Sequence, residues 1–276
     1  YLSLRRLENR IIAALQAGQG ELDFGASVKV SISQFHGIEI NDFAVTVAKT
    51  ALWIAEAQML KETAEILHRE PDYLPLKEYD GIVQGNALRM DWGRLESKSR
   101  VEGEEKTDNN SIVGLQTSTY DYIMGNPPFV GYSNQSAEQK ADMLSIFVDE
   151  KGKPYKTAGK LDYVCAWYRK AADYILGTTE YTENTEKKSS VYSVSSVVKN
   201  PSTKCAFVST NSICQGEAVA AFWKPLFEKG LEIDFAWRTF RWDNEAQAKA
   251  HVHCVIVGFH VLGTTEYTEN TEKKSS

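Results

Sequence analysis

Short apolar runs typical of strands alternate along this chain with longer apolar runs of helical period. This alternation is typical of α/β proteins, in which helices cover both faces of a mainly parallel sheet. Strands are expected at 28–32, 35–39, 81–83, 121–124, 206–208, 233–235 and 253–259. Helices are expected at 4–15, from Asn41 or Asp42 to about Leu67, at 161–175 and at 219–227. The closing pair of strands is expected to form an antiparallel hairpin.

The composition is that of a folded domain rather than of a disordered or fibrous chain. The 276 residues are enough for an α/β domain with a large core, and the apolar fraction of 42% is ordinary. No run of about 18 apolar residues occurs, which argues against a membrane span. The first residues, from Tyr1 to Arg6, lack the features of a signal peptide and do not begin with Met. A fragment of a cytoplasmic protein is therefore expected.

Cysteine spacing and net charge limit the function further. The cysteines show no CxxC spacing, which argues against a zinc site or a disulfide framework; they are Cys165, Cys205, Cys214 and Cys254. His251 and His253 alternate on a strand without an evident third ligand, so no metal site is expected. Because a nucleic-acid-binding face is usually basic, the net charge of -6 predicts that this chain alone binds DNA weakly.

The most informative motif is Asn126-Pro127-Pro128-Phe129, which follows the predicted strand 121–124 through Gly125. The exocyclic amine of adenine is a poor nucleophile because its lone pair is delocalised into the ring. The side-chain carbonyl of Asn126 and the backbone carbonyl of Pro127 can accept hydrogen bonds from that amine, which frees the lone pair for a methyl donor. Prolines fix φ and keep both carbonyls aimed at one point, and Phe129 offers a face on which an extruded base can stack. The alternative is an ordinary strand-terminating turn.

A second candidate site lies around Glu39, at the end of the predicted strand 35–39 and next to Ile40. A carboxylate at the C-terminal end of a strand can receive both ribose hydroxyls of an adenosine-containing cofactor. Asn86 and Ala87 follow the next predicted strand, where the adenine of such a cofactor would lie. An exposed strand-end glutamate without a ligand is the alternative interpretation of Glu39.

These residues resemble the methyltransferase region of MmeI-like enzymes, large fused restriction–modification proteins that methylate adenine at N6. The resemblance is carried by residues 37–52, 82–92, 121–132, 206–217 and 233–259. It implies a Rossmann-like class I S-adenosylmethionine-dependent methyltransferase sheet, with S-adenosylmethionine as methyl donor. It also implies double-stranded DNA with a flipped adenine as the partner. Asp162 and Tyr163 would help line the cofactor pocket, and Ser209 to Ser212 would lie near the floor of the active site.

The chain also departs from this family. The glycine-rich cofactor loop should lie just before Tyr1, and the chain has no such motif early enough. The missing first strand would be the central one, between the strands that end at Glu39 and Met124. The nuclease region and the target-recognition domain, which would follow Phe259, are also absent. We therefore expect the 276-residue chain to bind S-adenosylmethionine poorly and to be inactive by itself.

One segment does not fit the α/β pattern. The polar sequence from Leu176 to Ser190 recurs unchanged from Leu262 to Ser276, which is too faithful for a diverged structural repeat. Translated repetitive DNA inserted twice explains it, and a duplicated surface loop is the alternative. The predicted division is a first part of the methyltransferase core at 1–176, an inserted segment at 177–200, a second part at 201–262 and a repeat-derived tail at 263–276.

Other functions remain open from the sequence. The same Asn-Pro-Pro-aromatic loop can serve an N-methyltransferase that acts on a protein glutamine. The chain can also be a non-catalytic remnant or a fragment that binds a partner protein. Trp237, Phe240 and Trp242 either include a base-stacking ring or pack in the core, and Arg238 and Arg241 either contact phosphate or are solvated.

Overall fold

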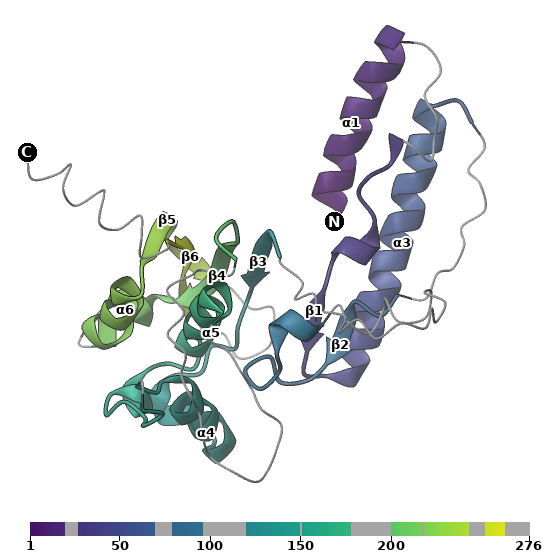
Figure 1. Cartoon of the computed structure of the whole chain (residues 1–276). Coiled ribbons are helices and arrows are strands. Elements are labelled where there is room, and N and C mark those ends of the chain that lie inside the picture. Colours follow the sequence, from purple (N-terminus) through teal and green to yellow (C-terminus); the bar gives the residue numbers. More distant parts are fainter. Residues whose placement is uncertain are drawn as a thin grey trace, which may run out of the picture. The chain divides into compact units, whose positions relative to one another are not determined.

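The computed structural model describes residues 1–19, 27–69, 79–95, 120–149, 151–177, 200–216, 218–242 and 252–262 (Figure 1). The chain divides into two compact units, Tyr1–Ser118 and Thr119–Ser276. Each unit combines helices with a sheet that contains a parallel pair of strands. The α/β character expected from the sequence is therefore present in both units.

The first unit combines two helices with a two-stranded parallel sheet. Its elements are α1 (Leu2–Gln19), η1 (Ile32–Gln34), β1 (Gly37–Glu39), α3 (Asp42–Ile66), β2 (Ile82–Gln84) and η2 (Trp92–Arg94). Helices α1 and α3 lie side by side (Figure 1). The side chain of Asn41 caps α3 by accepting a hydrogen bond from the amide of Ala44 at 3.1 Å. The predicted long helix and the two short strands of this unit are confirmed.

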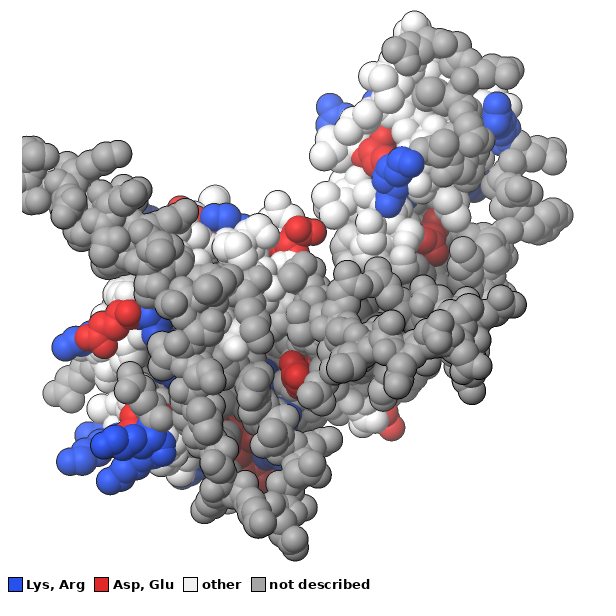
Figure 2. All heavy atoms as spheres, in the orientation of Figure 1, with Lys and Arg blue, Asp and Glu red and all other residues white. Residues whose placement is uncertain are grey.

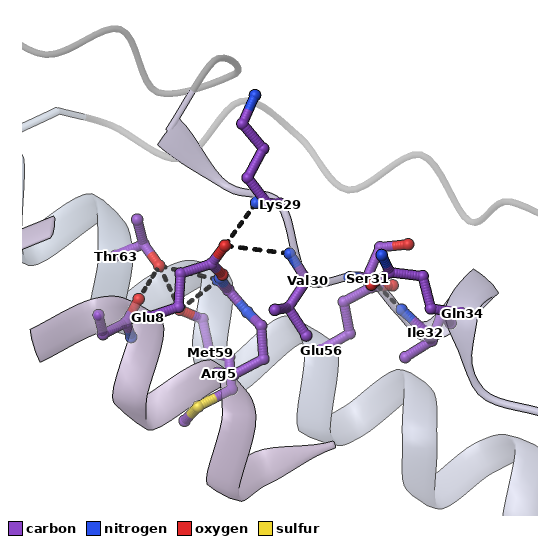
Figure 3. Close-up of polar contacts among 11 residues, drawn as sticks. Arg5, Glu8, Lys29, Val30, Ser31, Ile32, Gln34, Glu56, Met59 and Thr63 are labelled. Atoms are coloured by element: carbon purple, nitrogen blue, oxygen red, sulfur yellow. Dashed lines mark hydrogen bonds and ion pairs between the residues drawn. The ribbon is translucent and has the colours of Figure 1, made fainter. Parts of the chain in front are cut away.

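A buried polar cluster joins α1 to α3 (Figure 3). The side chain of Arg5 is 0% exposed and donates a hydrogen bond to Thr63 Oγ1 at 2.9 Å. Arg5 also forms an ion pair with Glu8. Thr63 in turn donates to the side-chain oxygen of Asn9 at 2.6 Å. A buried guanidinium group is tolerated because a carboxylate neutralises it and because hydrogen bonds replace those it would make with water.

The apolar face predicted for α1 is only partly buried. Ile12 is 2% exposed, but four other residues of that face are between 44% and 53% exposed, namely Leu4, Leu7, Ile11 and Leu15. The side of α1 that contacts α3 therefore includes the polar residues Arg5 and Asn9.

The strand predicted at 28–32 is wrong. Residues 28–30 form no strand, and η1 begins at Ile32 with a capping box between Ser31 and Gln34. The backbone amides at 29 and 30 donate to the carboxylate of Glu8 at 2.5 and 3.0 Å (Figure 3). Those amides are bonded to a side chain, so they are not available to a neighbouring strand.

The second unit is built on a four-stranded mixed sheet with the order β3-β4-β6-β5. Its strands are β3 (Tyr122–Gly125), β4 (Lys204–Thr210), β5 (Leu231–Trp242) and β6 (Val252–Val261). Its longer helices are α4 (Ala137–Ile146), α5 (Cys165–Leu176) and α6 (Ala218–Glu228), and its short helices are η3 (Tyr132–Asn134), η4 (Ala158–Lys160) and η5 (Asn211–Cys214). β3 and β4 are parallel, whereas β6 is antiparallel to both β4 and β5. The predicted closing hairpin is confirmed.

The core of this unit lies between the sheet and helices α5 and α6. Tyr168 of α5 is 0% exposed, and its ring lies against the rings of Phe207 in β4 and Phe259 in β6, with centroids 5.1 and 5.4 Å away. Two rings of α6, Phe222 and Trp223, lie 5.5 and 5.7 Å from the same ring. One buried aromatic side chain thus joins both helices to one face of the sheet.

The opposite face of this sheet carries exposed apolar side chains. Because Phe207 points to α5, its neighbour Ala206 points to the other face. Met124, Gly258 and Phe235 are aligned with Ala206 across the sheet and share that face. Met124 is 76% exposed and Phe235 is 53% exposed. No described element covers these two side chains, so helices on both faces, as predicted, are not found in this unit among the described residues.

Helix α4 is a further difference from the sequence prediction, which left this stretch unassigned. Its start carries a capping box between Ser136 and Gln139. Met143 and Ile146 are buried on the side of α4 that faces the unit. The Ser-x-x-Gln spacing was the available signal, although few apolar residues follow it.

The segment with the repeated sequence begins just after α5. Gly177 ends α5 in the left-handed conformation, with φ 70°. Asn200, where the described chain resumes, donates from its backbone amide to the carbonyl of Ile175 at 3.1 Å and from its side chain to the carbonyl of Tyr174 at 3.2 Å. Both copies of the repeat beyond Gly177 and Leu262 lie outside the described residues, so the predicted division at 176/177 and 200/201 stays a prediction.

Candidate functional site

The Asn126-Pro127-Pro128-Phe129 loop follows β3 directly. Among the described residues β3 is an end strand that pairs with β4 alone, and Gly125 is aligned with Phe207. Asn126 and Pro128 are exposed, Pro127 is buried and Phe129 is half-buried. No described residue donates a hydrogen bond to the side-chain oxygen of Asn126 or to the carbonyl of Pro127. The two carbonyls named in the sequence analysis are therefore free of other hydrogen bonds within the described part of the chain.

The far end of this loop is attached to the residues that precede α5. The carbonyl of Val130 accepts a hydrogen bond from the amide of Tyr163 at 2.9 Å. Two residues later, the amide of Tyr132 donates to Asp162 Oδ1 at 3.0 Å. The structure thus brings Asp162 and Tyr163 next to the loop, whereas their predicted place in the lining of the cofactor pocket stays a prediction.

The Tyr163 side chain points into the protein. It is 4% exposed, and its hydroxyl donates to Asp142 Oδ2 at 2.8 Å. Its ring makes an edge-to-face contact with Trp167, with a centroid distance of 5.2 Å. Asp142 belongs to α4 and is itself 4% exposed, so this bond attaches α4 to the start of α5. Asp142 was not a candidate from the sequence, because no local pattern links it to a residue so distant in the chain.

A pocket of about 180 Å³ lies beside the start of α5. It is lined by Tyr132, Lys160, Asp162, Cys165, Ser212, Ile213, Gln215 and Phe222. Burial, and after it the charge of Asp162, raises the pKa of the Cys165 thiol well above its usual value. This thiol therefore stays protonated and is a poor nucleophile. The residues Asn126 to Phe129 do not line the pocket.

The cofactor residues predicted in the first unit lie at one edge of its sheet. Glu39 and Gln84 are register partners at the C-terminal ends of the parallel strands β1 and β2, and Asn86 follows two residues after Gln84. Glu39 is half-buried; its Oε1 accepts a hydrogen bond from the amide of Asn41 at 3.0 Å, and no described residue bonds to its Oε2. Ile40 is 70% exposed. The free carboxylate oxygen beside an exposed backbone fits the recognition of a hydroxyl group.

Asn86 and Ala87 form the turn after β2. Asn86 Oδ1 accepts a hydrogen bond from the amide of Leu88 at 2.9 Å. The carbonyl of Ala87 accepts one from the indole nitrogen of Trp92 at 2.9 Å, and Trp92 is 7% exposed. Trp92 therefore packs in the core and supports the turn.

The remaining candidates lie on and after β5. Trp237 is 65% exposed on the uncovered face of the sheet, where it is aligned with Ile256. Phe240 is half-buried, and Arg238 and Arg241 are exposed. The neighbouring Thr239 donates to the side-chain oxygen of Asn211 at 3.0 Å, which attaches β5 to the end of β4. His251 lies outside the described residues.

The described ranges contain neither a metal-binding cluster nor a membrane-spanning helix. Within them, no three His, Cys, Asp or Glu side chains are grouped closely enough to hold a metal ion. None of the helices described is both long enough and apolar enough to cross a membrane.

The α/β fold, with an Asn-Pro-Pro-Phe loop after one strand and a glutamate at the end of another, has the features of a methyltransferase domain. The chain matches the family model described as MmeI, DNA-methyltransferase domain, over residues 1–274, and it belongs to that family. It resembles DNA methyltransferase A of Bacillus subtilis (strain 168), with 39% identity over 265 residues. That match covers 96% of this chain and 25% of the relative, so the chain spans about a quarter of the relative's length.

A solved structure supports the same assignment. The chain is similar to the Type IIL restriction-modification enzyme MmeI in complex with DNA, with a TM-score of 0.71 and 37% sequence identity. The match covers 96% of this chain and 29% of that enzyme. The family predicted from the sequence is therefore confirmed.

Proposed function

We propose that this chain is the methyl-transferring part of a restriction–modification enzyme that methylates adenine at N6 in double-stranded DNA. The proposal is carried by two carbonyl groups just after β3 that accept no hydrogen bond from a described residue. The side-chain oxygen of Asn126 is exposed, and neither it nor the carbonyl of Pro127 accepts a hydrogen bond from a described residue. Two adjacent free acceptors match the two N–H groups of an exocyclic amine.

The chemistry follows from these acceptors. Hydrogen bonds from the amine to Asn126 and Pro127 draw the nitrogen toward tetrahedral geometry, and its lone pair then becomes available for attack. S-adenosylmethionine supplies an electrophilic methyl group when it is bound. The positive charge that develops on the amine nitrogen lies next to two carbonyl dipoles that are already oriented, which is where such stabilisation is most effective. The amine then loses a proton to solvent and recovers its neutral form.

The half-buried ring of Phe129 is proposed to stack on the base. Adenine in a duplex is reached only after extrusion from the base stack, which costs a few kcal/mol. The Phe129 ring, at the end of the Asn126–Phe129 loop, offsets part of this cost by covering one face of the base. This role needs an accessible ring face, and a half-buried side chain is consistent with it.

We further propose that Glu39 binds the ribose hydroxyls of S-adenosylmethionine, with its unbonded Oε2 as one acceptor. Ile40, Asn86 and Ala87 would lie against the adenine of the cofactor. The turn that carries Asn86 and Ala87 is held by the buried Trp92, so its backbone is fixed before a ligand arrives. Tyr163 remains a candidate for the cofactor pocket from the family resemblance, and it would act through its backbone because its side chain is buried.

For the fold, we propose the Rossmann-like class I methyltransferase sheet. This proposal is supported by the position of β1 and of β3 at the end of their respective sheets, each with one strand partner among the described residues. Parallel strands are usually buried on both sides, and a two-stranded parallel sheet is rarely stable alone. Each of these two edges is therefore suited to pair with a further strand.

DNA as the partner rests on the family and on the DNA complex of the similar enzyme. The charge of this chain adds little support to the proposal of DNA as the partner. On the face that Figure 2 shows, basic and acidic side chains of the described residues are interspersed, apart from one small group of basic side chains at the lower left. Phosphate contacts sufficient for tight binding are therefore proposed to come from a recognition domain outside this chain.

The test uses a chimeric protein in which residues 1–276 replace the matching segment of the Bacillus subtilis relative. DNA from cells that produce this chimera, and that lack other adenine methylation, is digested to nucleosides and analysed by mass spectrometry. We expect N6-methyladenine with the wild-type segment and none with Asn126→Ala. A chimera that folds, binds S-adenosylmethionine and leaves adenine unmethylated would contradict the proposal.

Mass spectrometry of the proteins from the same cells, beside that of their DNA, separates the alternatives. Methylation of protein glutamine without methylated DNA would favour the protein methyltransferase. Absence of any methyl transfer by a folded, cofactor-binding chimera would favour the non-catalytic fragment.

A further inference from the structure

Asp162 lies three positions before Cys165, the first residue of α5, and both of its carboxylate oxygens are engaged. Oδ1 accepts the amide of Tyr132 at 3.0 Å. Oδ2 accepts the hydroxyl of Ser212, in a short contact, and that of Thr210 at 3.4 Å. The two hydroxyls are also 2.7 Å from each other. One carboxylate therefore joins three segments: the end of the Asn126–Tyr132 loop, the start of α5 and the end of β4.

We propose that Asp162 is a positioning residue for the Asn126–Phe129 loop, and that its carboxylate is committed to this task rather than to the cofactor. The proposal rests on the proposed function, because it concerns the same loop. It departs from the family resemblance, which implied a place for Asp162 in the lining of the cofactor pocket.

The loop is fixed at both ends by different means. At its start, β3 is paired with β4, with Gly125 opposite Phe207. At its end, the Val130 carbonyl accepts the amide of Tyr163, and the Tyr132 amide donates to Asp162. The residues between these two anchors, Asn126 to Phe129, make no hydrogen bond to a described side chain. Their geometry therefore depends on the anchors.

Because the hydroxyls of Thr210 and Ser212 bind Asp162, both ends of the loop are attached to the same strand, β4. Thr210 is the last residue of β4, and β4 is also the strand that pairs with β3. The start of the loop is fixed to β4 through backbone hydrogen bonds, and its end is fixed to β4 through Asp162. Both ends of the loop are thus attached to β4. This attachment holds the carbonyls of Asn126 and Pro127 at a constant separation.

A carboxylate suits this position better than a neutral group. It has only acceptor sites, and its partners here are one N–H and two O–H donors. Hydrogen bonds to an ionised acceptor are about twice as strong as those between neutral groups.

The test compares Asp162→Ala, Asp162→Asn and Ser212→Ala with a matched control, Asp149→Ala. Asp149 is also a carboxylate that accepts two backbone amides, those of Lys151 and Lys153, each at 2.9 Å, in a turn of the same unit. It has no contact with the loop among the described residues. Asp162→Asn keeps one oxygen acceptor for the Tyr132 amide and places a donor beside the two hydroxyl oxygens, so it serves as the conservative variant.

The first readout is amide hydrogen exchange at Tyr132 in the 276-residue chain. Loss of a bond to a charged acceptor predicts exchange faster by about 10-fold or more in Asp162→Ala. Asp162→Asn should restore most of the protection, Ser212→Ala should give an intermediate rate, and Asp149→Ala should leave Tyr132 unchanged. Equal Tyr132 exchange in Asp162→Ala and the unmodified chain would overturn the proposal, as would an equal effect of Asp149→Ala.

The second readout is the kinetics of the chimera described above. Asp162→Ala should lower kcat by about 10-fold or more and change KM for S-adenosylmethionine by less than about 3-fold, since a misplaced acceptor affects the transition state rather than cofactor binding. A rise in KM with kcat unchanged would show a cofactor ligand and refute the positioning role. If the unmodified chimera fails to methylate DNA, the proposed function is at fault, and the exchange experiment still decides whether Asp162 anchors the loop.

Discussion

The hydroxyl group of Tyr168 lies in the core beneath the candidate site. The structure allows the loss of stability caused by its removal to be estimated. The hydroxyl is 2.7 Å from Ser209 Oγ and 3.3 Å from the carbonyl of Phe207. Tyr168 and Ser209 are both 0% exposed. Burial raises the pKa of Tyr168, so the group remains a neutral hydroxyl throughout the ordinary pH range.

Tyr168→Phe keeps the ring and its contacts but leaves the hydroxyl of Ser209 without its partner. A buried hydrogen bond contributes about 1 kcal/mol, and an unsatisfied buried donor adds about 1–3 kcal/mol. We therefore expect Tyr168→Phe to destabilise the second unit by about 1–3 kcal/mol. Tyr168→Ala also removes the contacts with four aromatic rings and should cost about 3–5 kcal/mol.

The double variant gives the sharper test. Replacing both polar partners by apolar groups is close to neutral, because no unsatisfied group remains. Tyr168→Phe combined with Ser209→Ala should therefore cost less than the sum of the two single changes, by about 1 kcal/mol or more.

The free energies are measured by hydrogen exchange at the β4 amides, which reports unfolding of the second unit without assuming that both units unfold together. Strict additivity of the two single changes would refute this account of the core, as would an effect of Tyr168→Phe as large as that of Tyr168→Ala.

Three further outcomes are expected. Burial raises the pKa of Tyr79 to about 12, and its hydroxyl donates to the carbonyl of Phe35 at 2.5 Å. Because this folded-state pKa lies above the usual tyrosine value of 10.0, the stabilisation is complete below pH 10 and is lost as pH rises toward 12. Tyr79→Phe should therefore flatten the decline of Tm measured between pH 9.5 and 12. Gly81→Ala should destabilise the first unit in urea denaturation, because its Cβ would lie 2.5 Å from the backbone oxygen of Phe35. Gly159→Ala is the control and should be neutral or slightly stabilising, because its Cβ would have no atom within 4 Å. Ser136→Ala should reduce helix α4 stability by about 1 kcal/mol, seen as faster amide exchange in its first turn, and unchanged exchange there would contradict the capping role.

The sequence predicted the elements whose signals are local. Asn41 was one of two proposed caps for the long helix, and the structure assigns this role to it. The apolar run before Gly125 indicated a strand that ends at the Asn126 loop, and β3 ends there. In both cases a residue type at a fixed spacing determines the backbone conformation, so neighbouring residues suffice for the prediction.

The contacts that shape the site are not local, and the sequence alone did not give them. Asp162 bonds to Tyr132 and Ser212, which are 30 and 50 positions away along the chain. No periodicity links such residues, and their meeting depends on the order of the strands. The incorrect strand at 28–32 has the same origin, because the carboxylate of Glu8 binds its amides across a long stretch of chain.

Asn200 lies close to the end of α5, since it bonds to the carbonyls of Tyr174 and Ile175 in the last turn of that helix. The entropy of closing a loop rises only with the logarithm of its length, so each doubling costs about 0.6 kcal/mol. Codons added between Gly177 and Asn200 therefore change the free energy of unfolding very little, whatever peptide they encode. This position in the gene can receive foreign DNA while the rest of the domain still folds, which makes it a natural place for a transposed repeat to survive and a practical one for introducing a tag or a cleavage site.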